Sequence, residues 1–255
     1  MLINCKEIHD IILEQEKYEM NCEYTPMLSV IKVGDSKESD AYEKGIIKDC
    51  EKIGIKVTSV QLSSNICQYD LNKCVKNCSD TSKGVILQLP LPKNLSIKFA
   101  MSYIVPRKDI DGFRDDSEYI PATAKGIIML LEKLNMDLNS KNCVIIGRSK
   151  HIGRAVAKEL LNRNCTTTIC HSYTEDVSMY TKCADIIITA VGVPGFIRPN
   201  MIKDGALLID VGTTVVDGKI VGDVDISCAE KADLTPVPGG IGLMTRVALI
   251  DNLLN

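Results

Sequence analysis

Apolar, strand-like runs alternate with longer amphipathic stretches along almost the whole chain, and this alternation limits the fold more than any other feature. A first series of strand-like runs covers 27–33, 55–62 and 84–89, and a second covers 142–147, 166–170, 184–192 and 206–212. Helical patterns lie between them, at 39–53, 68–78, 94–104, 124–135, 153–163 and 175–182, and a last one covers 242–254. Alternating strands and helices predict parallel sheets covered by helices, so we expect an α/β fold with two lobes.

The two series also suggest the domain organisation. We expect an N-terminal α/β lobe over residues 1–121 and a Rossmann-type domain over 122–241, with the C-terminal helix at 242–255 joining the first lobe. Ser39 fits as the N-cap of the helix at 39–53, and Gly54 fits as its stop.

Composition excludes several classes of protein. The chain has 255 residues, of which 45% are apolar and 25% charged, with a net charge of −3 and no basic block, so we expect no nucleic-acid partner. Its apolar runs are shorter than the roughly 18 residues of a membrane span, and its start lacks a signal-peptide pattern. We therefore expect a cytoplasmic protein without membrane contact. The eleven cysteines form no CxxC pair and do not cluster with the three histidines, so we expect no metal.

The segment after the run at 142–147 predicts a phosphate-binding turn. Gly147 permits a tight turn, and Gly153 permits the following helix to approach the sheet closely. Backbone N–H groups and a helix N-terminus then favour an anion, such as the phosphates of a dinucleotide. The sequence is GxSxxxG rather than GxGxxG, so an ordinary strand-to-helix turn is the alternative.

The end of the run at 166–170 bears on the choice of dinucleotide. NAD-binding folds carry an acid there for the ribose, but here His171 and Ser172 follow, with no acid before Glu175. A guanidinium from Arg148 and a hydroxyl from Ser172 suit a ribose 2′-phosphate, which favours NADP over NAD. The alternative is that Arg148 forms only a surface ion pair.

Three further segments carry polar groups that could face a substrate. Gln88 ends a buried strand at the carboxyl edge of the first sheet, although it could simply cap a turn. Asp109 and Asp111 precede Gly112 in a loop, and only one of them should face a given cleft, the alternative being a solvated acidic loop. The proline–glycine loop at 235–240 offers exposed backbone that could clamp a planar ring.

Together these segments resemble the methylenetetrahydrofolate dehydrogenase/cyclohydrolase family. The matching stretches are VGDSKESDAY (33–42), QLPLP (88–92), KDIDGF (108–113), GRSKHIG (147–153), CHSYT (170–174), ADIIITAVG (184–192), IDVGT (209–213), GDVD (222–225) and TPVPGGIGLMT (235–245), in the family's order. The resemblance implies a folate-binding N-terminal lobe, a Rossmann-type dinucleotide-binding lobe and a substrate between them. It implies hydride transfer from 5,10-methylenetetrahydrofolate to NAD(P). Many members also hydrolyse the methenyl product to 10-formyltetrahydrofolate, and members are usually homodimers.

The resemblance also assigns roles to individual residues. Tyr42, Gln88 and Asp111 match the catalytic and folate-contacting group of the family, and Pro238 and Gly239 match its folate-side loop. The cofactor contacts of the family match Gly147, Arg148, Ser149, Ser172 and Thr213.

One departure from the family pattern concerns the chemistry. The family has S-x-x-Y-x-x-x-K, but here the position four residues after Tyr42 is Ile46. Lys44 and Lys48 lie two residues away, about 200° around a helix, so neither should replace it. Isoleucine cannot shuttle a proton, so the sequence favours a dehydrogenase with little or no cyclohydrolase activity.

Milder departures are PATAKG at 121–126 and GLMT at 242–245.

Two alternatives stay open. A lysine from elsewhere could restore a bifunctional enzyme, or the chain could be a non-catalytic paralogue that binds folate or nucleotide. Retention of Tyr42, Gln88, Asp111 and the GRS turn argues against the second.

Overall fold

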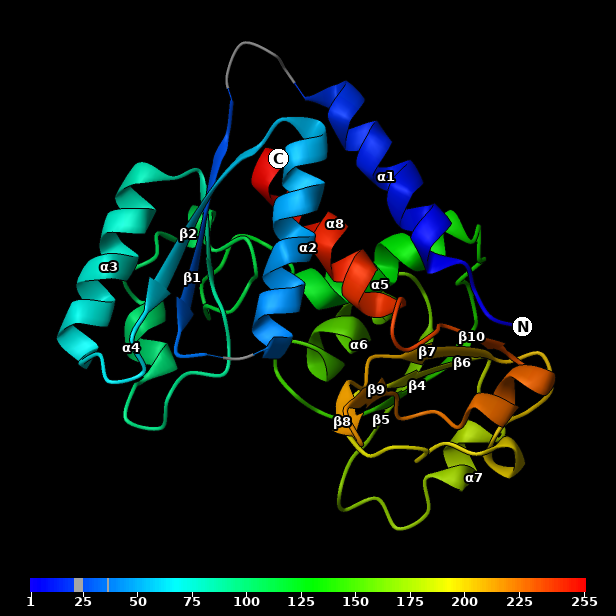
Figure 1. The fold of residues 1–255 in the computed structure, drawn as a ribbon. Coiled ribbons are helices and arrows are strands. Elements are labelled where there is room, and N and C mark those ends of the chain that lie inside the picture. The colour runs from blue at the N-terminus through cyan, green and yellow to red at the C-terminus, as the bar shows by residue number, and fades with distance from the viewer. Residues whose placement is uncertain (21–24, 36) are drawn as a thin grey trace. The chain divides into compact units, whose positions relative to one another are not determined.

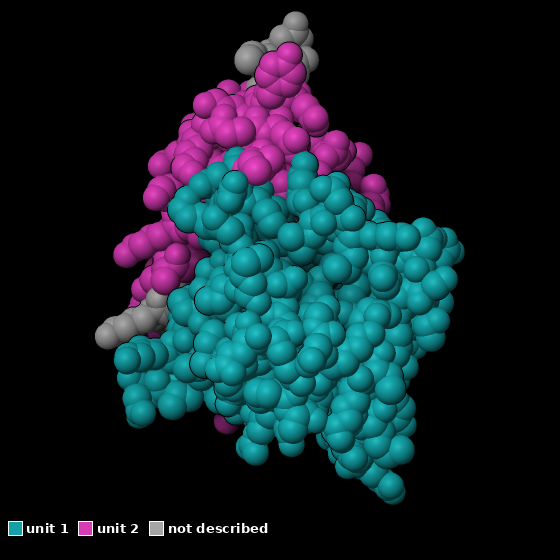
Figure 2. Space-filling view, turned by 90° about the vertical axis from the view of Figure 1, so that its right-hand side faces the viewer, with its two compact units in different colours: residues 1–10, 123–245 teal, residues 11–122, 246–255 magenta. Residues whose placement is uncertain are grey.

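The computed structural model describes residues 1–20, 25–35 and 37–255 and divides into two compact units. Unit 1 comprises residues 1–10 and 123–245, and unit 2 comprises residues 11–122 and 246–255 (Figure 2). Helix α8 (Ile241–Leu254) begins in unit 1 and ends in unit 2. The domain boundaries expected from the sequence remain a prediction. Within the described ranges, no helix has the length and apolar character that crossing a membrane requires.

Unit 2 is built on a three-stranded parallel sheet in the order β2–β1–β3, formed by β1 (Met27–Val33), β2 (Lys56–Leu62) and β3 (Gly84–Leu87). Helix α2 (Lys37–Ile53) lies on one side of this sheet, and α3 (Gln68–Thr81) with α4 (Ile97–Met101) lies on the other (Figure 1). The chain moves from β1 to β2 in one direction and back across β1 to β3 in the other. Right-handed crossovers therefore place their helices on opposite faces.

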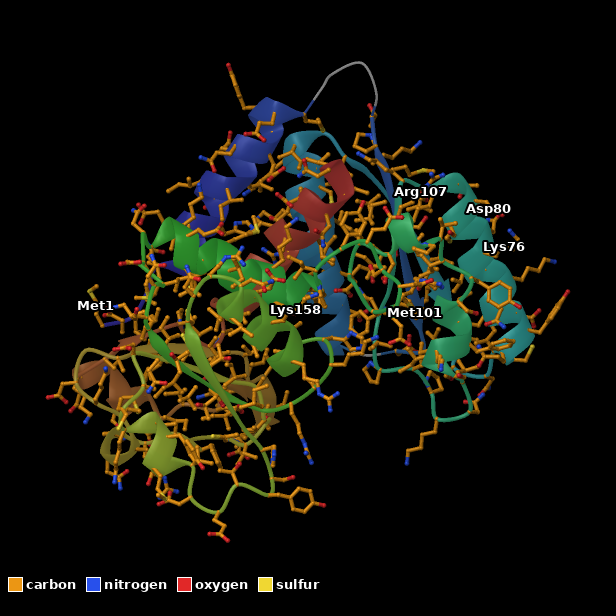
Figure 3. All side chains as sticks on the ribbon, turned by 180° about the vertical axis from the view of Figure 1, so that it is seen from behind. Met1, Lys76, Asp80, Met101, Arg107 and Lys158 are labelled. Carbon is orange, nitrogen blue, oxygen red and sulfur yellow. The ribbon has the colours of Figure 1, made fainter. Side chains whose placement is uncertain are left out.

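Alternation along the strands gives each face of the unit 2 sheet its own core. Ile31 and Val85 point toward α3, where they pack with Leu71 and Val75. The opposite face receives the end of α8, because a Cβ at Gly84 would lie only 2.7 Å from a methyl carbon of Leu253. The outer side of α3 carries an exposed ion pair between Lys76 and Asp80, 3.0 Å apart (Figure 3), which contributes little to stability.

Unit 1 contains a five-stranded parallel sheet in the order β10–β7–β6–β4–β5. Its strands are β4 (Asn142–Ile146), β5 (Thr166–Cys170), β6 (Ile186–Thr189), β7 (Leu207–Asp210) and β10 (Asp233–Leu234). Strand β4 has β5 on one side and β6 on the other, so the chain direction across the sheet reverses there. The carboxyl end of β4 is therefore the point where ligands bind in open α/β sheets.

Unit 1 also contains several short elements outside its sheet. Helix α6 (Gly153–Leu161) follows β4, and α7 (Ser178–Thr181) precedes β6. Helix α5 (Ala122–Lys133) approaches α8 so closely that a Cβ at Gly126 would lie 2.7 Å from the Met244 backbone. The two milder sequence departures, at 121–126 and 242–245, therefore contact each other.

The expected α/β architecture with parallel sheets is confirmed. The structure corrects several details. Helix α2 begins at Lys37, so the N-cap assignment of Ser39 is wrong, and the Ser39 side chain lies outside the described residues. The helices expected at 94–104 and 175–182 are only Ile97–Met101 and Ser178–Thr181.

Sequence reasoning also missed several elements. Helix α1 (Cys5–Glu19) was missed because charged residues interrupt its apolar pattern, although it buries one face with Cys5, His9, Ile12 and Leu13. The antiparallel hairpin of β8 (Thr214–Val216) and β9 (Lys219–Val221) and the two-residue strand β10 are too short to give a periodic signal.

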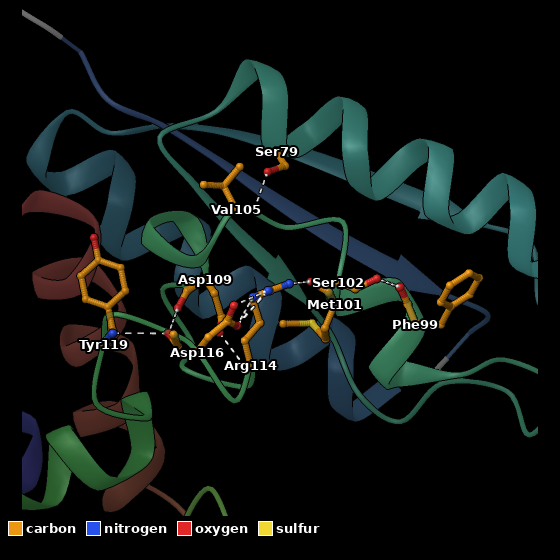
Figure 4. A network of polar contacts seen from close by, with 10 residues as sticks. Ser79, Phe99, Met101, Ser102, Val105, Asp109, Arg114, Asp116 and Tyr119 are labelled. Atoms are coloured by element: carbon orange, nitrogen blue, oxygen red, sulfur yellow. Dashed lines mark hydrogen bonds and ion pairs between the residues drawn. The ribbon is translucent and has the colours of Figure 1, made fainter.

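The loop that carries Asp109 and Asp111 is fixed by a polar network (Figure 4). The buried carboxylate of Asp109 accepts a hydrogen bond from the Arg114 N–H at 2.7 Å. The Arg114 guanidinium donates to the Met101 carbonyl at 2.7 Å and to both carboxylate oxygens of Asp116 at 2.8 Å. Gly112 turns the chain with φ +72°, and a Cβ there would lie 2.6 Å from the Cα of Pro121.

We expect Gly112→Ala to lower the free energy of unfolding more than Gly34→Ala does. Both glycines lie in unit 2 and have positive φ, +72° and +76°, so each alanine costs about 1–2 kcal/mol of backbone strain. Only Gly112 faces a backbone overlap, which adds about 1–3 kcal/mol, because a Cβ at Gly34 has its first neighbour at 3.4 Å. Urea denaturation of both variants measures the difference, and equal losses would contradict this account of the loop.

Candidate functional site

In unit 2, one face of α2 carries the predicted tyrosine and the position where the family has lysine. Tyr42, Ile46 and Asp49 are spaced by four and three residues, so they lie on one side of the helix. Ile46 is only 1% exposed, and Asp49 is 2% exposed. Burial raises the pKa of Tyr42, and the nearby charges of Asp111 and Asp49 add to this rise, while the charge of Arg246 opposes it. Tyr42 is therefore a neutral phenol that can donate a hydrogen bond.

Gln88 follows β3 directly, and its side-chain amide is buried with only 7% of the residue exposed. Neither Oε1 nor Nε2 has a hydrogen-bond partner among the described residues. The backbone N–H of Gln88 donates to the Ile31 carbonyl at 2.9 Å, which continues the strand ladder. The side chain therefore does not cap a turn. Buried amides without partners are costly, so this group is suited to a ligand that supplies both a donor and an acceptor.

The two aspartates of the 106–121 loop lie in different surroundings. Asp109 is fully buried, so the interpretation of this segment as a solvated acidic loop is wrong for Asp109. Asp111 is close enough to Tyr42 for its charge to act on the phenol. Burial raises the pKa of Asp111 to about 7, and the charge of Asp109 adds to this rise. Asp109 thus stabilises the loop itself, whereas the charge of Asp111 acts on Tyr42.

In unit 1, the turn after β4 brings the backbone very close to the start of α6. A Cβ at Gly153 would lie 2.1 Å from the Gly147 carbonyl oxygen, and Gly147 itself has φ +116°. The Ser149 hydroxyl accepts from the Gly153 N–H at 3.4 Å, and the Ser149 carbonyl accepts from Arg154 at 3.0 Å. Both glycines are therefore required by close approach, as in phosphate-binding turns.

Arg148 and Ser172 lie on adjacent turns at the same sheet edge. Strands β4 and β5 pair in register from Asn142 to Ile146, and the Gly147 N–H donates to the Cys170 carbonyl at 2.9 Å. The Arg148 guanidinium lies over the Tyr173 ring, 5.5 Å from its centroid, next to Ser172 in sequence. Arg148, Ser149 and Ser172 are all exposed, so their polar groups are available to a ligand.

Thr213, Pro238 and Gly239 are exposed on loops that follow β7 and β10. The loop from Thr235 to Gly240 is tied to β7, because the Thr235 hydroxyl accepts from the Asp210 N–H at 2.8 Å. Gly239 has φ +95° with open space around it.

Two buried carboxylates that sequence reasoning did not single out organise these loops. Asp223, fully buried, accepts from the N–H groups of Val191, Gly192 and Val193 at 2.7–3.2 Å and from the Thr189 hydroxyl at 3.1 Å. Asp210 accepts from the N–H groups of Gly212, Asp223 and Val224 at 2.8–3.0 Å. Burial raises the pKa of Asp210, while these N–H donors oppose the rise. The sequence segments IDVGT and GDVD contain these two residues, but the sequence does not indicate that their carboxylates accept these hydrogen bonds.

In the described part of the chain, no group of three or more His, Cys, Asp or Glu side chains is arranged to hold a metal ion. A dinucleotide is a different case, because Gly147, Gly153, Arg148 and Ser172 form an open, cationic turn at the carboxyl end of β4.

The fold and these sites define a two-domain α/β protein with a Rossmann-type NAD(P)-binding domain and a separate domain that carries buried and half-buried polar residues. Family profiles match both parts. Residues 3–111 match the tetrahydrofolate dehydrogenase/cyclohydrolase catalytic domain, and residues 121–255 match the NAD(P)-binding domain of the same family. The chain belongs to the tetrahydrofolate dehydrogenase/cyclohydrolase family, as its sequence motifs predict.

Individual relatives agree with this assignment. The chain is 40% identical to the bifunctional protein FolD of Clostridium tetani, over 97% of this chain and 93% of that protein. It superposes on the crystal structure of the bifunctional enzyme FolD from Campylobacter jejuni with a TM-score of 0.93 and 37% identity, covering 100% and 97% of the two chains. The Trypanosoma brucei enzyme, crystallised with NADP and an inhibitor, gives a TM-score of 0.92 at 32% identity, covering 100% and 96%.

We expect Asp111→Asn to be more stabilising at pH 8 than at pH 5. The folded chain keeps the Asp111 proton up to about pH 7, whereas the unfolded chain loses it near 3.8, so the wild type loses stability as the pH rises through this window. Asparagine does not titrate, so the gap in unfolding free energy should widen by about 2–3 kcal/mol between the two pH values. Urea denaturation at both pH values measures it.

The exposed Asp80→Asn variant is the control, because Asp80 is 57% exposed on α3. Its difference from the wild type should not change with pH. A gap for Asp111→Asn that stays constant between pH 5 and pH 8 would contradict the raised pKa of this carboxyl.

Proposed function

We propose that this protein oxidises 5,10-methylenetetrahydrofolate to 5,10-methenyltetrahydrofolate with NADP and has weak or no cyclohydrolase activity. The observation that supports it most strongly is the combination of two features. The buried Gln88 amide has no hydrogen-bond partner among the described residues, and the residue at position 46 is a buried isoleucine. The names of the relatives fit the dehydrogenase reaction.

Tyr42, Gln88 and Asp111 provide the folate contacts in this proposal. The Gln88 amide offers one donor and one acceptor that have no partner among the described residues, and a pterin edge carries matching groups. Asp111 offers a carboxyl group that can accept from ring and amino N–H groups of the pterin. Pro238 and Gly239 contribute exposed backbone on the folate side.

The dinucleotide contacts come from the turn after β4 and the neighbouring loops. Gly147 and Ser149 present backbone groups to the phosphates, and Arg148 with Ser172 holds the 2′-phosphate. Thr213 lies on the loop after β7, at the same edge of the sheet. When bound, the oxidised nicotinamide supplies the hydride acceptor.

The two reactions of the family make different demands on the protein. Hydride loss from the methylene bridge is assisted by the folate nitrogen, so the protein needs to align the reactants and exclude water. Hydrolysis of the methenyl bridge needs an activated water and a proton shuttle, for which a positioned acid–base group gives about 10²–10⁴-fold. Ile46 is apolar and 1% exposed, so it can serve the first demand and not the second.

A bifunctional dehydrogenase/cyclohydrolase is the second candidate. It is favoured by the relatives, since the Clostridium tetani and Campylobacter jejuni proteins are both named bifunctional. In that case another group must activate water in place of the family lysine.

One pair of assays separates these functions. We expect the purified chain to form NADPH from methylenetetrahydrofolate, and to hydrolyse methenyltetrahydrofolate at least 100-fold more slowly than a lysine-containing relative such as the Clostridium tetani protein. Hydrolysis at a rate comparable to that relative would favour the bifunctional candidate. Absence of NADPH formation would reject the dehydrogenase.

The choice of dinucleotide has its own test. Arg148→Gln should raise the KM for NADP by about 10–100-fold, because a charge-assisted contact to the 2′-phosphate is lost, and should leave the KM for NAD within about twofold. Arg154→Gln, at the second residue of α6, is the matched control for removing a nearby arginine. Equal effects of Arg148→Gln on both dinucleotides would contradict the assignment of the 2′-phosphate to Arg148.

We further propose a cytoplasmic homodimer. The family resemblance supports the dimer. The sequence has eleven cysteines, an odd number that cannot all pair as disulfides, which fits a reducing compartment. Sedimentation of the purified chain measures the assembly state.

A further inference from the structure

The face of α2 that carries Tyr42 and Ile46 meets a cation from another element. The Nε of Arg246, on α8, lies 2.8 Å from the Asp49 carboxylate, and the two side chains are 17% and 2% exposed. Both residues belong to unit 2. Because the pair is largely buried, water and salt screen its charges less than those of a surface pair.

Gly45 provides the room for this cation. A Cβ at residue 45 would lie 2.0 Å from Nη1 and 2.8 Å from Cζ of Arg246, so the guanidinium lies directly on the α2 backbone. Glycine inside a helix is unfavourable by about 1 kcal/mol relative to alanine. Here any larger residue would displace the guanidinium.

The guanidinium also acts on the predicted catalytic tyrosine. Tyr42 is three residues before Gly45, on the same side of α2. The charge of Arg246 lowers the pKa of Tyr42, against the effects of burial and of the neighbouring aspartates. The guanidinium thus lies against α2 at Gly45, next in sequence to the position where the family carries lysine, and its charge reaches Tyr42.

We propose that Arg246 is a positioning residue of the dehydrogenase site, which supplies from α8 the positive charge beside Tyr42 that residue 46 of α2 cannot supply. This inference rests on the proposed function. A guanidinium stays protonated in proteins and cannot pass a proton on, so it can orient the Tyr42 phenol and balance the carboxylates but cannot activate water. It thus accounts for a site that keeps hydride transfer without hydrolysis.

A second consequence is that Arg246 and a lysine at position 46 exclude each other. Both cations would lie on one face of α2, and Asp49 is already paired with the guanidinium. Like charges repel more strongly where they are shielded from water. The effects of substitutions at the two positions should therefore depend on each other.

The test is a double-mutant cycle with Ile46→Lys, Arg246→Met and the combination, assayed for NADPH formation. We expect Arg246→Met to lower kcat/KM for methylenetetrahydrofolate at least tenfold and to leave the KM for NADP within twofold. Arg246→Lys should retain activity within about threefold. Ile46→Lys alone should lose activity, and the double variant should recover at least fivefold over Arg246→Met.

Two further variants separate positioning from stability. Gly45→Ala keeps the arginine and favours the helix but displaces the guanidinium, so it should reproduce the loss caused by Arg246→Met while remaining folded. Arg163→Met removes an ion-paired arginine, 2.8 Å from Glu159 on α6, and should leave folate kinetics unchanged.

The inference is overturned if Arg246→Met and Gly45→Ala both leave folate kinetics within twofold, or if the losses at positions 46 and 246 simply multiply in the double variant. These outcomes leave the proposed function intact. A wild-type chain that forms no NADPH contradicts the proposed function instead, and the inference with it.

Discussion

Buried carboxylates that accept backbone N–H groups are the constraint on which both functional regions depend. At the carboxyl ends of parallel strands the chain leaves the ladder, and its N–H groups need new acceptors. In unit 1, Asp223 and Asp210 provide these acceptors for the loops after β6, β7 and β9. In unit 2, Asp109 does the same for the loop that carries Asp111. The loops can therefore hold exposed or ligand-facing residues without being loose.

Two groups of unit 2 have surroundings that cost free energy. The half-buried Asp111 lies near the buried Asp109 and keeps its proton up to about pH 7. The Gln88 amide is buried without any partner among the described residues. Both groups are unfavourable in the absence of a ligand, and both become favourable once a ligand with complementary donors and acceptors replaces water. Groups that lower the stability of the unliganded fold in this way are typical of binding sites.

Much of the fold could be predicted because strands buried on both faces leave a strong apolar signal, as at 27–33 and 142–147. The predicted site residues could be placed on loops and strand ends for the same reason. The hairpin of β8 and β9 could not be predicted, because three-residue strands are too short to show a periodic pattern. Asp223 and Arg246 were missed for a different reason: their partners, Val191 and Asp49, are distant in sequence, and neither residue breaks the pattern of its own segment.

The Arg246 guanidinium lies against Gly45, and this contact links two positions that are some 200 residues apart in the sequence. As long as position 246 is arginine, any side chain at position 45 collides with the guanidinium. Away from such a contact, alanine is the better helix former by about 1 kcal/mol. Glycine at position 45 and arginine at position 246 therefore constrain each other, although different helices carry them.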